Sequence, residues 1–285
     1  MSCDICPVCK SELSKGCRSW HFLCNNCGYE KSSLLPGINL DSAHHLIDER
    51  ARETGLRELR ISNFKELLTK IISLKPDGGR LLEVGCAHGW FIELAKDYFE
   101  VLGLEPDENV FKAASYRGLP IRMGYFPDIL DDDEQFDVIV FNDVFEHIAN
   151  VEDILESCYK LLSSNGLLVL NLPSSGGLFY RISKIFCRFG NFYAFERLWQ
   201  KGFPSPHLHY FSLSNLTSLL NQNGFDEKRK GSLSTLNLSG LYTRITYTGK
   251  ANILKRISVY AGVVLLLPML KILPGDIVYV ISRRR

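Results

Sequence analysis

Short apolar runs alternate with helix-like segments through the middle of the chain. Residues 80–86 (RLLEVGC), 100–106 and 136–143 have the apolar character of buried strands, while 90–98 and 151–162 have the spacing of amphipathic helices. Strands that alternate with helices favour crossover units and a mostly parallel sheet. We therefore predict an α/β fold with a doubly wound, mostly parallel sheet. The other elements expected in it are a helix at 108–117 and strands at 119–123 and 166–173.

A helix is also expected ahead of the first of these strands. Its apolar positions have the spacing of one buried helix face, and they are Phe64, Leu67, Leu68, Ile71 and Ile72. Asn63 or Ser62 is a suitable cap for its start. We expect residues 34–75 to form a helical connector that leans on the following domain.

The pattern divides the chain into an N-terminal segment 1–33, the connector, and a main domain 76–285. Within the main domain, residues 178–205 are rich in aromatic and basic side chains. We predict that they form a lid insertion with an aromatic wall for an apolar or ring-shaped substrate. The alternative is that these aromatic side chains simply pack against the domain.

Composition and charge narrow the classes of function. Hydrophobic residues make up 46% and charged residues 23%, as in ordinary soluble globular proteins. A net charge of +1 gives no general attraction for nucleic acid, so nucleic acid is an unlikely partner. The N-terminus has cysteines, Asp4 and Pro7 where a signal peptide has a basic and then an apolar stretch. We therefore expect a cytoplasmic location.

The N-terminal segment has the cysteine spacing of a zinc ribbon. Cys6-x-x-Cys9 and Cys24-x-x-Cys27 are two pairs separated by 14 residues, and four thiolates in two such pairs can surround one zinc ion. About 30 residues bury little core, so metal binding would supply the folding energy. Cys3-x-x-Cys6 is an equally allowed pair, but CPVCK mirrors CNNCG. A reduced set of cysteines without metal is the alternative.

The residues that follow the first two predicted strands indicate a nucleoside ligand. Ligands of such sheets bind beyond the carboxyl ends of the strands. Gly85 and Gly89 let the backbone approach a ligand, and Glu105, 16 positions past Gly89, can accept hydrogen bonds from both ribose hydroxyls. The loop GCAHG lacks the middle glycine of a dinucleotide site. We therefore expect a ligand with a ribose but without a pyrophosphate.

Taken together, these stretches resemble a known family. LLEVGCAHGWFIELA, VLGLEPD, FDVIVFNDVFEHI and LLVLNLPS are similar to the class I S-adenosylmethionine-dependent methyltransferases, which have a Rossmann-like fold. PSPHLHYFSLSNLTSLLNQNGF resembles a stretch of one branch that often carries an N-terminal zinc ribbon. That branch is associated with small-molecule, sugar or cell-surface polysaccharide pathways. The motifs are specific for the cofactor and not for the acceptor.

The resemblance implies roles for individual residues around S-adenosylmethionine. Glu83, Gly85 and Gly89 would lie along the methionine part. Glu105 would hold the ribose hydroxyls. The remaining cofactor-binding candidates are Pro106, Tyr125 and Phe126, which would flank the adenine, and Asn142, which follows the fourth strand.

Two histidines are candidates for a catalytic base. Methyl transfer from a sulfonium is an in-line displacement, and a base is needed only when the acceptor loses a proton. The resemblance places His147 near the acceptor, and it brings His209, which shares a side with His207 in an extended segment, to the mouth of the site. Alternatively these histidines are structural, or Glu146 and His147 help to hold a divalent metal.

The run 257–270 raises the question of membrane contact. Its 14 residues fall short of the roughly 20 that cross a bilayer as a helix, and Pro268 interrupts it. A buried helix leading to a last strand at 275–282 is favoured. The alternative is an interfacial helix, helped by the arginine tail 283–285, which would make the protein peripheral to a membrane.

These observations predict an S-adenosylmethionine-dependent methyltransferase that acts on a small molecule, a sugar or a glycan- or lipid-linked precursor. An RNA methyltransferase is one alternative, although NDVF after the fourth strand is not an acidic-proline motif. A non-catalytic module, in which a zinc ribbon and a cofactor-binding fold recruit partners, is another. The fold alone does not decide among them.

Overall fold

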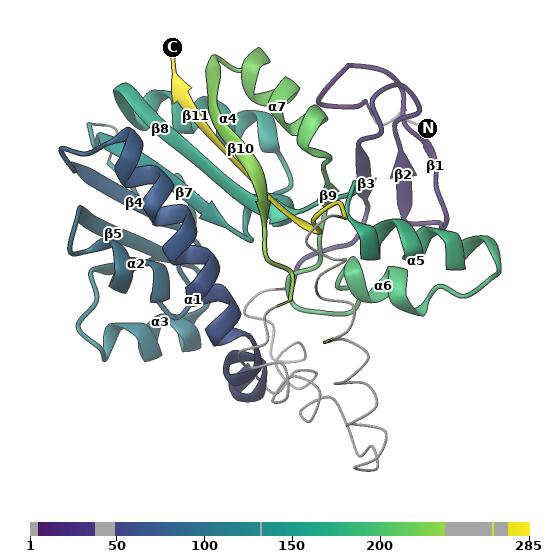
Figure 1. Cartoon of the computed structure of the whole chain (residues 1–285), viewed down its shortest axis with the longest axis horizontal. Helices are drawn as coiled ribbons and strands as arrows, with labels where there is room; N and C mark the ends of the chain where they lie inside the picture. The colour runs from purple at the N-terminus through teal and green to yellow at the C-terminus, as the bar shows by residue number, and fades with distance from the viewer. Residues whose placement is uncertain (1–4, 38–48, 132, 237–263, 265–272) are drawn as a thin grey trace.

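The computed structural model describes residues 5–37, 49–131, 133–236, 264 and 273–285 (Figure 1). They form a seven-stranded sheet in the order β10-β11-β8-β7-β4-β5-β6 and a four-stranded sheet in the order β1-β2-β3-β9. The strands of the large sheet are β4 (Arg80–Val84), β5 (Glu100–Glu105), β6 (Ile121–Met123), β7 (Phe136–Asn142), β8 (Leu162–Pro173), β10 (Phe225–Leu233) and β11 (Ile277–Arg284).

The large sheet is mostly parallel. β6, β5, β4, β7 and β8 pair in parallel, whereas β11 runs antiparallel to both β8 and β10. The predicted α/β fold class is therefore confirmed, together with the predicted strands and the last strand of the chain. The antiparallel edge strand β10 was not predicted from the sequence pattern.

Helices cover both faces of the sheet, as the side-chain alternation along a strand requires. Leu82 faces one hydrophobic core, while its neighbour Leu81 faces the other. α4 (Val151–Leu161) and α7 (Leu213–Gln222) pack in the first core; α1 (Glu49–Leu74) and α2 (Trp90–Ala95) pack in the second (Figure 1). α3 (Glu108–Ser115) lies beside β5 and β6.

The connector helix is longer than its apolar pattern indicates. Phe64, Leu67 and Ile71 are buried against the sheet, as predicted. The helix begins at Glu49, however, so neither Ser62 nor Asn63 is its cap. Asn63 lies inside the helix, and its amide donates a hydrogen bond to the backbone oxygen of Ser234 at 2.9 Å. The polar side chain thus ties the helix to the end of β10.

The N-terminal ribbon shares a sheet with the main domain. Its strands β1 (Ser14–Lys15), β2 (His21–Leu23) and β3 (Glu30–Ser32) are completed by β9 (His209–Tyr210), which pairs antiparallel with β3. Cys6, Val8, Cys24 and Tyr29 of the ribbon also belong to the core of the large sheet. The shared strand and the shared core show that the ribbon is docked on the main domain.

The insertion predicted as a lid packs mainly on this ribbon. It forms α5 (Leu178–Arg188) and α6 (Tyr193–Leu198). Its buried aromatic side chains form one cluster with a ribbon tryptophan and the shared strand: Trp20, Tyr180, Phe195, Trp199 and Tyr210. Tyr180, Phe195 and Trp199 of the insertion therefore pack against the domain, whereas Phe179, Phe186, Phe189 and Tyr193 are exposed.

A buried carboxylate reinforces the contact between ribbon and insertion. Glu30 accepts hydrogen bonds from the Tyr180 hydroxyl and the Lys184 ammonium, each at 2.7 Å, and its Oε2 lies 2.6 Å from His21 Nε2. Burial alone would raise the pKa of Glu30, but the hydrogen bond from His21 and the charge of Lys184 hold it below the usual value. This pairing compensates for the removal of the charge from water.

The apolar run 257–270, predicted as a buried or an interfacial helix, lies outside the described residues except for residue 264. Among the helices that the structure describes, none is both long and apolar enough to cross a membrane.

Candidate active site

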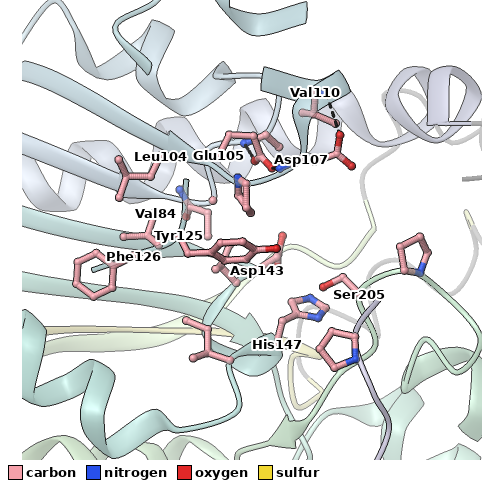
Figure 2. Close-up of a pocket in the computed structure, with 18 of the residues that line it drawn as sticks. Val84, Leu104, Glu105, Asp107, Val110, Tyr125, Phe126, Asp143, His147 and Ser205 are labelled. Atoms are coloured by element: carbon pink, nitrogen blue, oxygen red, sulfur yellow. Dashed lines mark hydrogen bonds between the residues drawn. The ribbon is translucent and has the colours of Figure 1, made fainter. Parts of the chain in front are cut away.

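A cavity of about 680 Å³ lies at the carboxyl ends of β4, β5 and β7. Figure 2 shows Glu105 and Asp107 on one side of it and His147 and Ser205 on the other. Its volume is in the range of small-molecule sites. Seven of the predicted site residues line it: Gly85, Glu105, Pro106, Tyr125, Phe126, Asn142 and His147.

The glycine loop after β4 is shaped by its backbone. Gly85 has a φ of 67°, and a Cβ there would lie 2.6 Å from a methyl carbon of Val144. Both facts restrict the position to glycine. Gly89 has a φ of 70°, but it does not line the cavity, since a Cβ there would meet Leu119 at 2.4 Å. Gly89 therefore shapes the turn, and the residues of this loop that line the cavity are Gly85, Ala87 and His88.

Glu105 ends β5 with its carboxylate at the cavity wall. Its two oxygens accept hydrogen bonds from the backbone N–H groups of Ala87 and Asp107, each at 2.8 Å. The residue thus fixes the glycine loop to the start of the next helix. Burial raises the pKa of Glu105 to about 7, partly offset by these two hydrogen bonds. A small change in pH near neutrality therefore changes the charge of Glu105.

Glu83 lies behind the cavity wall and does not line it. It is 2% exposed, and one oxygen accepts a 2.8 Å hydrogen bond from the amide of Asn142, which does line the cavity. Burial raises the pKa of Glu83 to about 8. Glu83, predicted to lie along the methionine part of the cofactor, therefore reaches the cavity wall only through Asn142.

At the opposite end of the cavity, His147 lines the wall, and Glu146 and His207 are buried next to it. Glu146 and His147 stand in a short 3-10 helix, η2 (Phe145–His147), and His207 comes from the segment before β9. Oε1 of Glu146 lies 3.8 Å from His147 Nε2 and 3.9 Å from His207 Nε2. Glu146 is 1% exposed, and neither of its oxygens has a hydrogen-bond partner. Burial, followed by the nearby Asp143, raises the pKa of Glu146 well above its usual value.

His209, the second predicted catalytic base, is buried and does not line the cavity. The side chain is buried, with Nδ1 hydrogen-bonded to the Tyr29 hydroxyl and Nε2 bonded to the carbonyl of Ile148 at 2.7 Å. Burial lowers the pKa of His209 to about 4, so the ring is neutral at physiological pH. Both nitrogens serve to join the ribbon to the main domain.

Several lining residues were not predicted individually. Arg60 of α1 reaches the cavity and lies 3.4 Å from Asp143, and Pro36 comes from the segment after the ribbon. The end of the insertion contributes Gln200 and residues 203–205. The predicted lid range includes these last residues, so its position was informative even though its aromatic helices pack elsewhere.

The four predicted zinc-ligand cysteines lie together in the ribbon. Sγ of Cys6 is 3.5 Å from Sγ of Cys27, and Sγ of Cys9 is 3.3 Å from Sγ of Cys24. All four sulfur atoms lie within 4.8 Å of one another. Tetrahedral zinc–sulfur bonds of about 2.3 Å place sulfur atoms about 3.8 Å apart, so the set suits one ion. Cys3, the other candidate, lies outside the described residues.

The order of the sheet and the cavity at its strand ends are those of the class I methyltransferase fold. Residues 50–227 match the family model described as a methyltransferase domain, and the chain belongs to this family. This family agrees with the resemblance to S-adenosylmethionine-dependent methyltransferases that the sequence motifs carry.

Relatives and solved structures agree with this class. The chain is 28% identical over 163 residues to the mitochondrial ubiquinone biosynthesis O-methyltransferase of Bos taurus, which covers 50% of the chain and 44% of that protein. It is 31% identical over 130 residues to the ubiquinone biosynthesis O-methyltransferase of Bradyrhizobium diazoefficiens, with 43% and 51% covered. The chain thus matches about half the length of these relatives.

Two solved structures share the fold. A S-adenosylmethionine-dependent methyltransferase from Thermotoga maritima superimposes with a TM-score of 0.57 at 16% identity, covering 85% of the chain and 97% of that structure. Magnesium protoporphyrin IX methyltransferase from Synechocystis, with bound S-adenosylhomocysteine, gives a TM-score of 0.53 at 14% identity, covering 82% and 87%. At these identities the likeness concerns the fold alone.

Proposed function

We propose that this protein transfers the methyl group of S-adenosylmethionine to a hydroxyl group of a small-molecule acceptor. The observation that carries the proposal is one cavity with two different ends. Glu105 lies at one end, suited to a ribose, and His147 lies at the other, beside the buried Glu146. The ubiquinone biosynthesis relatives are named as O-methyltransferases, which supports an oxygen acceptor.

The cofactor would be held mainly by the ends of β4 and β5. Glu105 would accept hydrogen bonds from the ribose hydroxyls with lone pairs that its two backbone donors leave available. Gly85 would allow the amino acid part to approach the backbone, and Tyr125 and Phe126 would flank the adenine. When bound, the cofactor supplies a methyl group on a positively charged sulfur.

The acceptor would enter from the side of His147. Apolar and aromatic lining at this end comes from Pro36, Ile148, Phe203 and Pro204. Such a lining favours an acceptor with an apolar or ring-shaped body, and the polar groups orient its hydroxyl. Alignment of that hydroxyl with the sulfonium would supply much of the rate. Loss of its proton would take place at the cluster that contains His147.

We also propose that the ribbon holds one structural zinc ion through Cys6, Cys9, Cys24 and Cys27. The support is the grouping of the four sulfur atoms described above. Zinc would hold together the N-terminal segment on which β9 is built. It would thereby also support the chain next to His207.

Glu105→Ala is expected to weaken binding of S-adenosylhomocysteine by about 1.5–3 kcal/mol, or roughly 10- to 150-fold, because hydrogen bonds to a charged group are lost. Isothermal titration calorimetry measures this directly. Glu134→Ala is the matched control, since that carboxylate pairs with Arg80 and Arg122 away from the cavity. Equal affinity of Glu105→Ala and wild type would remove the proposed ribose contact.

Cofactor affinity should also depend on pH through Glu105. The ionised carboxylate is the better acceptor, and its pKa of about 7 in the free protein means that protonation removes the binding form as the pH falls. Affinity should therefore drop about tenfold between pH 8 and pH 6. The decrease in affinity should be smaller in Glu105→Gln, because the glutamine at this position cannot ionise. A parallel pH dependence in the two proteins would contradict this assignment.

The methyl transfer itself is tested with a small panel of acceptors. A catechol-type phenol, a sugar and a lipid-linked sugar are each incubated with protein and S-adenosylmethionine, and the products are analysed by mass spectrometry. We expect a gain of one methyl group on an oxygen of one class, with equimolar S-adenosylhomocysteine. Methylation confined to RNA or to a nitrogen acceptor would overturn the proposal.

A further inference from the structure

We propose that Gln200 determines acceptor specificity, because its amide oxygen accepts a hydrogen bond from a hydroxyl group of the acceptor other than the one that is methylated. The inference rests on the proposed function, since it concerns the acceptor of the same methyl transfer. It narrows that acceptor to a ring-shaped compound that carries a second hydrogen-bond donor near the reacting hydroxyl. The position, the backbone and the hydrogen bonding of Gln200 carry the inference.

The first observation is the position of Gln200 at the acceptor end of the cavity. It lines the cavity together with residues 203–205, which follow it in the same turn. The next residue, Pro206, accepts a hydrogen bond from Nδ1 of His147 at 2.9 Å, so the turn is fastened to the proposed base. An acceptor whose hydroxyl reaches His147 therefore has its remaining groups close to this turn.

The second observation is the backbone of Gln200, which has a conformation that glycine adopts more easily. Its φ is 51°, in the left-handed region that is uncommon for residues with a side chain. Two hydrogen bonds hold the turn: its N–H donates to the carbonyl of Arg197 at 3.1 Å, and its carbonyl accepts from the N–H of Phe203 at 3.0 Å. Strained positions of this kind are concentrated at active sites and ligand sites, where they place a side chain.

The third observation is the hydrogen bond that orients the amide of Gln200. Its Nε2 lies 2.8 Å from Nε2 of His207, which is buried. An amide nitrogen can only donate, so the imidazole nitrogen accepts, and the amide oxygen is the group left for a ligand. In the part of the chain that the structure describes, no donor is hydrogen-bonded to that oxygen. His207 is itself held through its carbonyl, which accepts from Ser32 Oγ at 2.8 Å, so it acts as a positioning residue for Gln200.

His147 and Gln200 would together hold two hydroxyl groups of one acceptor. His207 connects them, because its ring centroid is 4.8 Å from that of His147 and its Nε2 accepts from Gln200. Since Nδ1 of His147 donates to a backbone carbonyl, Nε2 is the nitrogen that can take the proton of the reacting hydroxyl. The amide oxygen of Gln200 would hold the second hydroxyl. An acceptor without that group would leave the amide oxygen unpaired and would bind less tightly.

The test measures the affinity of small ring-shaped probes for protein saturated with S-adenosylhomocysteine, by NMR titration. The probes are phenol, the dihydroxybenzenes catechol and resorcinol, and the monomethyl ether of each dihydroxybenzene. The ethers keep the second oxygen but cannot donate a hydrogen bond from it. We expect at least one dihydroxybenzene to bind wild type about fivefold more tightly than phenol and than its own ether, which is the scale of one hydrogen bond.

Three variants assign the preference to the amide. Gln200→Leu should lose it, because leucine is of similar size and has no amide, and the part-exposed turn should still fold. His207→Leu should weaken the preference while affinity for S-adenosylhomocysteine stays unchanged, a result that a purely structural role of His207 does not give. Gln222→Leu is the matched control, since the amide of this exposed glutamine donates to Ser218 outside the cavity, and it should behave as wild type.

Three outcomes would overturn the inference: a preference that persists in Gln200→Leu, ethers that bind wild type as tightly as the dihydroxybenzenes, or no binding of any probe to the saturated wild-type protein. Titration of the same samples with S-adenosylhomocysteine shows separately whether the proposed function stands. Normal cofactor binding without a preference among the probes would remove the role of Gln200 alone.

Discussion

His147→Ala is expected to lower single-turnover methyl transfer at least 100-fold, which corresponds to about 2.7 kcal/mol of transition-state stabilisation. The residue lines the cavity beside the buried Glu146, at the end opposite Glu105. It would take the acceptor's proton as a general base. The measurement uses saturating S-adenosylmethionine and an acceptor identified by the panel.

Two comparisons make this result specific. Affinity of His147→Ala for S-adenosylhomocysteine should stay within about threefold of wild type, because the ribose and adenine contacts are elsewhere. His209→Ala should mainly lower thermal stability, since it removes the buried contacts to Tyr29 and Ile148. Near-normal turnover by a folded His147→Ala protein would contradict this role. The rate would then come from alignment of the acceptor with the cofactor, and the acceptor would be a group that reacts without losing a proton to a base.

Cys24→Ser is expected to lower the melting temperature by about 10 °C. Structural zinc contributes about 10–16 kcal/mol in small zinc-binding peptides, and loss of even a third of this changes the melting temperature by that amount in a protein of this size. The ribbon provides three of the four strands of its sheet, so β9 should loosen with it. Differential scanning calorimetry and zinc analysis measure the two effects together.

The matched control is Cys17→Ser, a ribbon cysteine outside the four-sulfur cluster, which should keep its zinc and most of its stability. Cofactor affinity of Cys24→Ser should change little, because Glu105 and Gly85 stand on the large sheet. Turnover should fall, because Ser32 of the ribbon holds the backbone of His207. Wild-type stability in a zinc-free Cys24→Ser protein would show that the cysteines are packing residues only.

The cofactor end of the site was predictable because it depends on local rules. An apolar strand followed by a glycine loop places Gly85 at the sheet edge, and the next strand places Glu105 beside it. Both residues follow from the order of strands and helices. The sequence could not show which of the predicted residues line the cavity and which support its wall. Glu83 and Gly89 support the wall because they lie against Asn142 and Leu119, which are distant in sequence.

The acceptor end depends on contacts over long sequence separations, and it was only partly predictable. His207 and His209 were expected to share a side, but His209 instead contacts Tyr29, 180 residues earlier in the chain. The docking of the ribbon on β9 decides this, and no local pattern encodes it. The burial of Glu146 between two histidines has the same origin, since one of them arrives with the segment that joins the ribbon.

Calorimetric titration of the wild-type protein with S-adenosylhomocysteine tests the central claim most directly. The account predicts saturable binding of one molecule per chain, weakened roughly 10- to 150-fold in Glu105→Ala and little affected in Glu134→Ala. Absence of binding by folded wild-type protein, or binding of a nicotinamide dinucleotide in its place, would contradict it.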